Sequence, residues 1–164
     1  MGFQHYWQLV CVVFIYTLHF IYAHSAPHDY VKAHNVVRKE VGLAPVKWNT
    51  SIAKFAESYA HKRKSDCALV HSRNKMYGEN IALGYGPNGE FSGLDAVKLW
   101  VDEKAYYNYE SNSCRPSKMC GHYTQIVWKK STHIGCGRAK CQNNAYFVTC
   151  NYYPPGNYIG EKPY

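Results

Sequence analysis

The hydrophobic pattern of the first half of the chain has a helical period. Apolar residues recur at helical spacing after Pro27, again after Asn49, and a third time over residues 94–105. Pro27 suits a first helical position, and Gly42 ends the first pattern. Asn49 is a favoured N-cap residue for the second helix. The apolar face of that helix consists of Ile52, Phe55, Ala56, Tyr59 and Ala60.

The second half of the chain alternates apolar and polar residues at a period of two. This pattern predicts strands at 123–128, 134–139 and 145–152, with a turn at 142–144 between the last two. Helices followed by a small antiparallel sheet indicate an α+β domain.

An apolar run at residues 9–20 precedes these elements. A membrane span needs about 20 apolar residues, so the run is too short to cross a bilayer. Small Ala23 follows it, which is typical of a signal peptide over residues 1–23, although no Lys or Arg precedes the run. A cut after Ala26 is the alternative. Residues 24–164 then form one domain, for which we expect no stable membrane anchor.

The cysteine count indicates disulfide bonds. Of seven cysteines, Cys11 lies in the expected signal peptide and six remain. An even number behind a secretion signal predicts three disulfides. Six cysteines allow 15 pairings, and spacing alone does not choose among them. No Cys-x-x-Cys pair of the kind that holds structural zinc occurs.

The net charge is +8, from 19 Lys and Arg against 11 Asp and Glu. The basic residues are scattered, and the densest run, 62–64, falls at the end of a predicted helix, where cations complement the helix dipole. This distribution favours solubility and attraction to acidic surfaces. We expect no nucleic-acid partner and a monomeric protein.

Two polar side chains are expected to face the interior. Glu103 falls in line with the apolar stripe of the third helix, and His122 shares a face with apolar residues of the predicted strand. A buried charge is costly without a partner. Both residues are therefore candidate members of a site.

Several short motifs resemble one known family. Residues 121–128 (GHYTQIVW) and 147–152 (FVTCNY) followed by 154–158 (PPGNY) are similar to two signatures of the CAP superfamily: cysteine-rich secretory proteins, antigen 5 and pathogenesis-related protein 1. Four further pieces occur in the family's order, namely 33–35 (AHN), 71–72 (HS), 77–80 (YGEN) and 100–103 (WVDE). The compact length, the six cysteines and the final residues resemble the plant branch.

The resemblance implies an α-β-α sandwich with a small antiparallel sheet between helices. It also implies the disulfides Cys67–Cys141, Cys114–Cys120 and Cys136–Cys150. A cleft is expected to be lined by His71, Glu79, Glu103 and His122. Two imidazoles and two carboxylates could hold zinc or another divalent cation. They could also act as acid and base around a water, or simply form a hydrogen-bonded network.

Other features suggested by the resemblance lie toward the C-terminus. An aromatic loop with Tyr106, Tyr107 and Tyr109 is a candidate lipid site, since related proteins bind sterols and Tyr rings suit an apolar ligand with one polar group. These rings could instead only pack the loop. Residues 154–164 are either a releasable signalling peptide or a tail fixed to the domain. Asn49-Thr50-Ser51 is a glycosylation sequon, unless Asn49 serves only as a cap.

These observations predict a secreted, extracellular defence-associated protein that acts by binding a sterol or similar lipid. In a plant its place would be the apoplast rather than the vacuole. We expect no enzymatic activity and no required cofactor. The alternatives left open are a precursor of a C-terminal defence-signalling peptide and a metal-dependent hydrolase that uses the four His and Glu residues.

Overall fold

The structure is a computed structural model that describes residues 26–86 and 89–164. The expected signal peptide lies outside the described residues. Within them, four α-helices occur: α2 (Pro27–Glu40), α3 (Thr50–Lys62), α4 (Gly93–Asp102) and α5 (Gly121–Ile126). Short 3₁₀ helices follow two of these, η2 (Arg63–Ser65) and η4 (Glu103–Tyr106). None of the described helices is long and apolar enough to cross a membrane.

The strands form one sheet and one separate hairpin. The sheet has the order β1 (Lys47–Trp48), β5 (His133–Lys140), β6 (Tyr146–Tyr153) and β2 (Gly78–Gly84). Only the pairing of β1 with β5 is parallel. The hairpin joins β3 (Tyr107–Asn108) to β4 (Ser113–Cys114).

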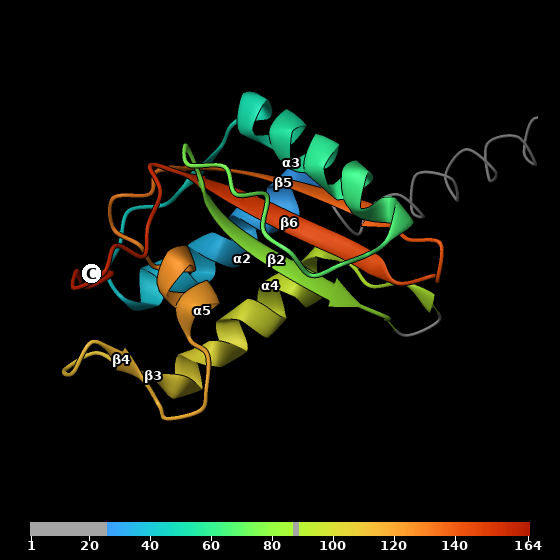
Figure 1. Cartoon of the computed structure of the whole chain (residues 1–164). Coiled ribbons are helices and arrows are strands. Elements are labelled where there is room, and N and C mark those ends of the chain that lie inside the picture. The colour runs from blue at the N-terminus through green and yellow to red at the C-terminus, as the bar shows by residue number, and fades with distance from the viewer. Residues whose placement is uncertain (1–25, 87–88) are drawn as a thin grey trace, which may run out of the picture.

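Helices cover both faces of the sheet. Helix α3 lies on one face, and α2, α4 and α5 lie on the other (Figure 1). The two faces have separate buried clusters, of which the larger joins α2, α4 and α5 to the sheet. The expected α-β-α sandwich is therefore confirmed.

Two glycines on β5 let α3 approach the sheet closely. A Cβ added to Gly135 would lie 2.1 Å from the Ala53 nitrogen, and one added to Gly137 would lie 2.4 Å from the Glu57 nitrogen. Both clashes are with helix backbone, which cannot turn aside as a flexible side chain could. Helix α3 consequently packs directly on the β5 backbone.

The three predicted helices are confirmed. The Asn49 side-chain oxygen accepts hydrogen bonds from the amides of Ser51 and Ile52, as expected of an N-cap. Ser92 and Asp95 form a capping box at the start of α4. The third predicted helix corresponds to α4 and η4 together.

The strand predicted at 123–128 is wrong, because residues 123–126 belong to α5 and 127–128 follow its end. The amides of Thr124 and Val127 donate to the carbonyls of Cys120 and Tyr123, four residues earlier. Every residue from Tyr123 to Trp128 is buried, including the polar Thr124 and Gln125, so no one-sided helical pattern of apolar residues appears. The other two predicted strands correspond to β5 and β6. Strand β2, the two-residue β1 and the hairpin were not predicted.

All three disulfides implied by the family resemblance are present. Cys67 bonds Cys141, Cys114 bonds Cys120, and Cys136 bonds Cys150. The first closes the largest loop, with a sequence separation of 74 residues, and the second closes a loop of only 6.

Helix α2 supplies a buried cation that holds the segment around α5. The guanidinium of Arg38, 1% exposed, donates hydrogen bonds to the carbonyls of Ala44, Ile126, Trp128 and Ser131 at 2.9–3.1 Å. Burial lowers the pKa of Arg38 to about 10, so the group remains charged at neutral pH. No carboxylate in the described part of the chain forms an ion pair with it.

A buried histidine on the same helix makes stability depend on pH. His34 bonds the Tyr30 carbonyl through Nδ1 at 2.7 Å and the Tyr152 hydroxyl through Nε2 at 2.8 Å. A carbonyl only accepts, so Nδ1 carries the proton and Nε2 accepts from Tyr152. The Tyr152 oxygen in turn accepts from the Asn80 amide. This arrangement requires a neutral His34.

We expect acid to destabilise the protein through His34. Burial first, and then the charge of Arg38, lower the pKa of His34 from 6.5 to about 4. Between these two values only the unfolded state binds the proton, so stability is full above pH 6.5 and falls by about 3 kcal/mol on the way to pH 4. Urea unfolding at several pH values measures this loss. His34→Gln should flatten the curve in this window, and an unchanged slope would contradict the assignment.

Candidate functional site

The four candidate His and Glu residues form two hydrogen-bonded pairs. In the first, Glu103 opens η4 and His122 lies in the first turn of α5. One Glu103 oxygen accepts from His122 Nδ1 at 2.7 Å, and the other accepts from the His122 backbone amide at 2.9 Å. The His122 ring also stacks on Trp100 with centroids 6.3 Å apart. Glu103 therefore fixes the orientation of His122.

The second pair joins β2 to the loop before it. Glu79 Oε1 accepts from His71 Nδ1 and from the Ser72 amide, both at 2.8 Å, and Oε2 accepts from the Asn151 amide at 3.2 Å. Burial raises the pKa of Glu79, but the hydrogen bonds from His71, Ser72 and Asn151 outweigh this effect and hold the pKa below its usual value. Glu79 is thus an ionised carboxylate that fixes His71.

One cavity connects the two pairs. This histidine cleft has a volume of about 410 Å³ and is lined by His71, Glu79 and His122. Its other wall includes Lys118, Met119 and the Cys114–Cys120 disulfide. Glu103 does not line it. Sequence analysis placed His122 on a strand, whereas the structure places it on α5, and Glu79 lies on β2.

The arrangement gives no support to metal chemistry. Among residues 26–86 and 89–164, no three His, Cys, Asp or Glu side chains are grouped so that they could hold a metal ion. Each carboxylate is occupied by the Nδ1 of its own histidine. Ser72, the hydroxyl next to His71 in sequence, accepts from the Asn74 amide, and no bond to His71 is present in the described residues. The geometry is that of two hydrogen-bonded pairs that stiffen the cleft walls.

The rings of the aromatic loop contact one another, α5 and the C-terminal residues. Tyr107 packs against Tyr123 at 6.0 Å, and its hydroxyl donates to the Asn112 side chain at 2.9 Å. Tyr109 stacks on Tyr164 with centroids 4.8 Å apart. The rings therefore pack against α5 and the C-terminal residues, and the lipid-binding role of the loop stays a prediction.

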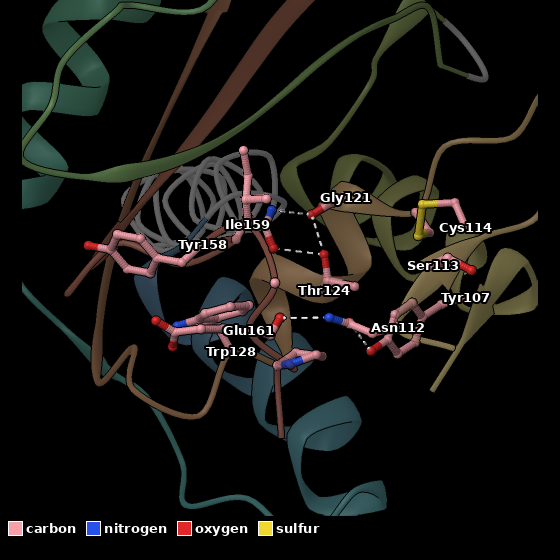
Figure 2. A pocket seen from close by; sticks show the side chains of 14 residues that line it. Tyr107, Asn112, Ser113, Cys114, Gly121, Thr124, Trp128, Tyr158, Ile159 and Glu161 are labelled. Carbon is pink, nitrogen blue, oxygen red and sulfur yellow. Dashed lines mark hydrogen bonds between the residues drawn. A yellow bond between two sulfur atoms is a disulfide. The ribbon is translucent and has the colours of Figure 1, made fainter. Parts of the chain in front are cut away.

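Two hollows flank Tyr107. The hairpin pocket, of about 400 Å³, is polar and includes Tyr106, Asn108 and Arg115. The tail pocket, of about 280 Å³, lies between the hairpin, α5 and the C-terminal residues (Figure 2). Its walls are mainly apolar: Tyr107, Trp128, Tyr158, Ile159, Pro163 and the Cys114–Cys120 disulfide.

Sequence analysis did not assign Trp128, Tyr158 or Ile159 to a site. It treated residues 154–164 only as a peptide that is either released or fixed. In the structure this segment is docked on the domain. Asn157 donates to a carbonyl of α5, and the carbonyls of Pro163 and Glu161 accept from the Lys129 amide and from the Asn112 side chain of the hairpin. Its exposed Ile159 and aromatic Tyr158 are a signal that could have indicated a binding surface.

Comparison with known proteins agrees with these features. Residues 31–152 match the family model described as CAP, the cysteine-rich secretory protein family. A pathogenesis-related protein of the PR-1 type from Sambucus nigra is 51% identical, with 95% of this chain and 92% of the relative covered. Pathogenesis-related protein 1A from Nicotiana tabacum is 45% identical, with 100% of both chains covered.

Solved structures share the fold. Venom allergen-like protein 4 from Schistosoma mansoni has a TM-score of 0.65 and 30% identity, with 84% of this chain and 92% of that chain covered. NaASP2, solved with Zn²⁺, has a TM-score of 0.69 and 24% identity, with 85% and 84% covered. The family match over residues 31–152 and the PR-1 relatives together show that this chain belongs to the CAP family and is closely similar to its plant pathogenesis-related protein 1 branch.

Proposed function

We propose that the protein is a secreted, extracellular defence protein that acts by binding an apolar ligand with one polar group, such as a sterol. Its relatives carry the name pathogenesis-related protein and are covered over nearly their whole length, which supports a defence-related role. The family description as secretory proteins and the three disulfides support an oxidising, extracellular location.

The tail pocket is the observation that carries the binding proposal. Small-molecule sites are concave and mostly apolar, with a few fixed polar groups. Here the rings of Tyr107, Trp128 and Tyr158 supply the apolar walls, while Thr124 and Asn157 bring polar atoms to the lining. The two polar residues are fixed by a mutual hydrogen bond of 2.7 Å.

The pocket volume limits what part of a ligand it holds. About 280 Å³ lies at the lower end of the roughly 300–1,000 Å³ typical of small-molecule sites. A sterol would therefore place one end in the pocket and extend its remainder along the neighbouring exposed surface. Ile159, which is fully exposed, and Tyr158 provide apolar contacts there.

We expect Tyr107→Ala combined with Tyr109→Ala to abolish sterol binding, and His122→Ala to leave it largely intact. Tyr107 lines the tail pocket and Tyr109 stacks on Tyr164 of the C-terminal segment, whereas His122 lines only the histidine cleft. Binding of a radiolabelled sterol by the mature protein measures the effect. Circular dichroism of each variant shows that the fold is retained.

Tyr106→Ala is the matched control, because Tyr106 lines the hairpin pocket and not the tail pocket. It should retain most of the binding. The opposite pattern would be loss of binding in His122→Ala and on addition of a chelator, with binding by the Tyr107→Ala, Tyr109→Ala variant unaffected. It would reject this proposal in favour of metal-dependent chemistry in the histidine cleft.

A further inference from the structure

One wall of the tail pocket is formed by a segment that is held at its two ends. We call residues 157–164 the tail. Six of the pocket's lining residues belong to it: Asn157, Tyr158, Ile159, Gly160, Glu161 and Pro163. The remaining lining residues come from the hairpin, the Cys114–Cys120 region and α5 with Trp128. The pocket as it stands therefore exists only while the tail is docked.

The first anchor of the tail is on α5. Asn157 donates through its amide to the Gly121 carbonyl at 2.8 Å and accepts from the Thr124 hydroxyl at 2.7 Å (Figure 2). Just before it, the Gly156 amide donates to the Gln125 side chain at 3.1 Å. These bonds hold the start of the tail on one side of the pocket.

The second anchor is on the hairpin and the segment after α5. Tyr164 stacks on Tyr109 at 4.8 Å, and Lys162 Nζ lies 4.3 Å from the centre of the same ring. The Asn112 amide donates to the Glu161 carbonyl at 3.0 Å (Figure 2), and the Lys129 amide donates to the Pro163 carbonyl at 2.7 Å. Tyr109 therefore contacts two residues of the tail's far end, Tyr164 and Lys162.

Between these anchors the tail has little support from the domain. Ile159 is fully exposed, and Tyr158 is about half exposed with its ring 6.2 Å from that of Trp128. Gly160 has a φ of +83°, a conformation that glycine adopts readily, and no atom lies within 4 Å of where its Cβ would be. This middle part of the tail can shift more easily than its ends.

From this geometry we infer that the tail is a detachable wall of the binding site, whose docking and ligand occupancy stabilise each other. The inference rests on the proposed function. A ligand in the tail pocket contacts residues from both the tail and the domain, so it binds the docked state more tightly than the undocked state. By linkage, whatever weakens docking must weaken binding, and the ligand must strengthen docking in return.

The Lys129 amide is a direct reporter of docking, because its hydrogen-bond acceptor, Pro163, belongs to the tail. Hydrogen exchange of this amide in the full secreted protein, followed by nuclear magnetic resonance, should slow when a fluorescent sterol is added. The Val127 amide, which donates to Tyr123 within α5, is the internal control and should exchange at the same rate with and without sterol.

Tyr109→Ala tests the coupling from the other side. Loss of the ring stack and of the Lys162 contact should speed Lys129 exchange and weaken sterol binding, each by about tenfold. Tyr109→Phe keeps both ring contacts and loses only the hydroxyl bond to the Tyr164 carbonyl. Its effects on exchange and affinity should be clearly smaller.

The outcomes separate the two proposals. The wild type could bind sterol without any slowing of Lys129 exchange, and Tyr109→Ala could bind it equally well. That result would overturn the detachable wall and leave the proposed function standing. Absence of sterol binding by the wild type would overturn the proposed function, and the coupling with it. Faster exchange in Tyr109→Ala together with weaker binding would support both.

Discussion

Arg38→Leu is expected to lower the free energy of unfolding by about 4 kcal/mol. The substitution removes the donor for the carbonyls of Ala44, Ile126, Trp128 and Ser131, and each of these acceptors that is left buried and unsatisfied costs about 1–3 kcal/mol. Relief from burying a charge offsets part of this loss, since burial already lowers the pKa of Arg38. The loss of several hydrogen bonds outweighs this relief.

Urea unfolding followed by circular dichroism measures the Arg38 effect. Arg38→Lys should fall between the wild type and Arg38→Leu, because one ammonium cannot reach all four carbonyls that the planar guanidinium bonds. The matched control is Arg115→Leu, an exposed arginine that should change stability by no more than about 0.5 kcal/mol. A loss below about 1 kcal/mol in Arg38→Leu would refute the role assigned to this group.

Removing the Cys67–Cys141 disulfide should cost about twice as much as removing Cys114–Cys120. A disulfide acts mainly by restricting the unfolded chain, and the effect grows with the length of the closed loop. Separations of 74 and 6 residues correspond to about 4.5 and about 2 kcal/mol in the chain-entropy model. The double variants Cys67→Ala with Cys141→Ala, and Cys114→Ala with Cys120→Ala, therefore form a matched comparison.

Unfolding midpoints and the yield of secreted protein report on both disulfide variants. The long-loop variant should be the less stable and the more poorly secreted of the two. Equal losses would show that the short disulfide contributes chiefly through native contacts of the hairpin, and the loop-length explanation would then be wrong.

The helices were predictable because their signals are local. Pro27 and Asn49 mark helix starts within one turn of the residues that they affect, and the apolar positions that follow repeat on one side. The same holds for β5 and β6, whose residues follow each other through a short turn. Fold class therefore followed from short stretches of sequence.

The errors occur where long-range burial decides the structure. Residues 123–128 are all buried, polar Thr124 and Gln125 included, so this segment carries no helical amphipathicity. Strand β2 pairs with β6, with Glu79 opposite Asn151, and 72 residues separate these partners. Neither element has a local signal strong enough to identify it.

The site was predicted residue by residue but not in its arrangement. Family motifs identified the four His and Glu residues, and Glu103 was also expected from its helical position to need a partner. The motifs did not show that the four residues divide into two hydrogen-bonded pairs. The docking of Tyr164 on Tyr109 joins residues 55 positions apart, which no pattern within either segment could indicate.

The glycines of β5 have a consequence for how this fold can acquire new specificities. Because α3 packs on the backbone at Gly135 and Gly137, larger side chains on that face would push the layers apart. The three hollows described above are instead lined by the hairpin, α5, the start of β2 and neighbouring loops. New specificities can therefore arise from substitutions at the hairpin end of the domain, while the packing of α3 on β5 stays unchanged.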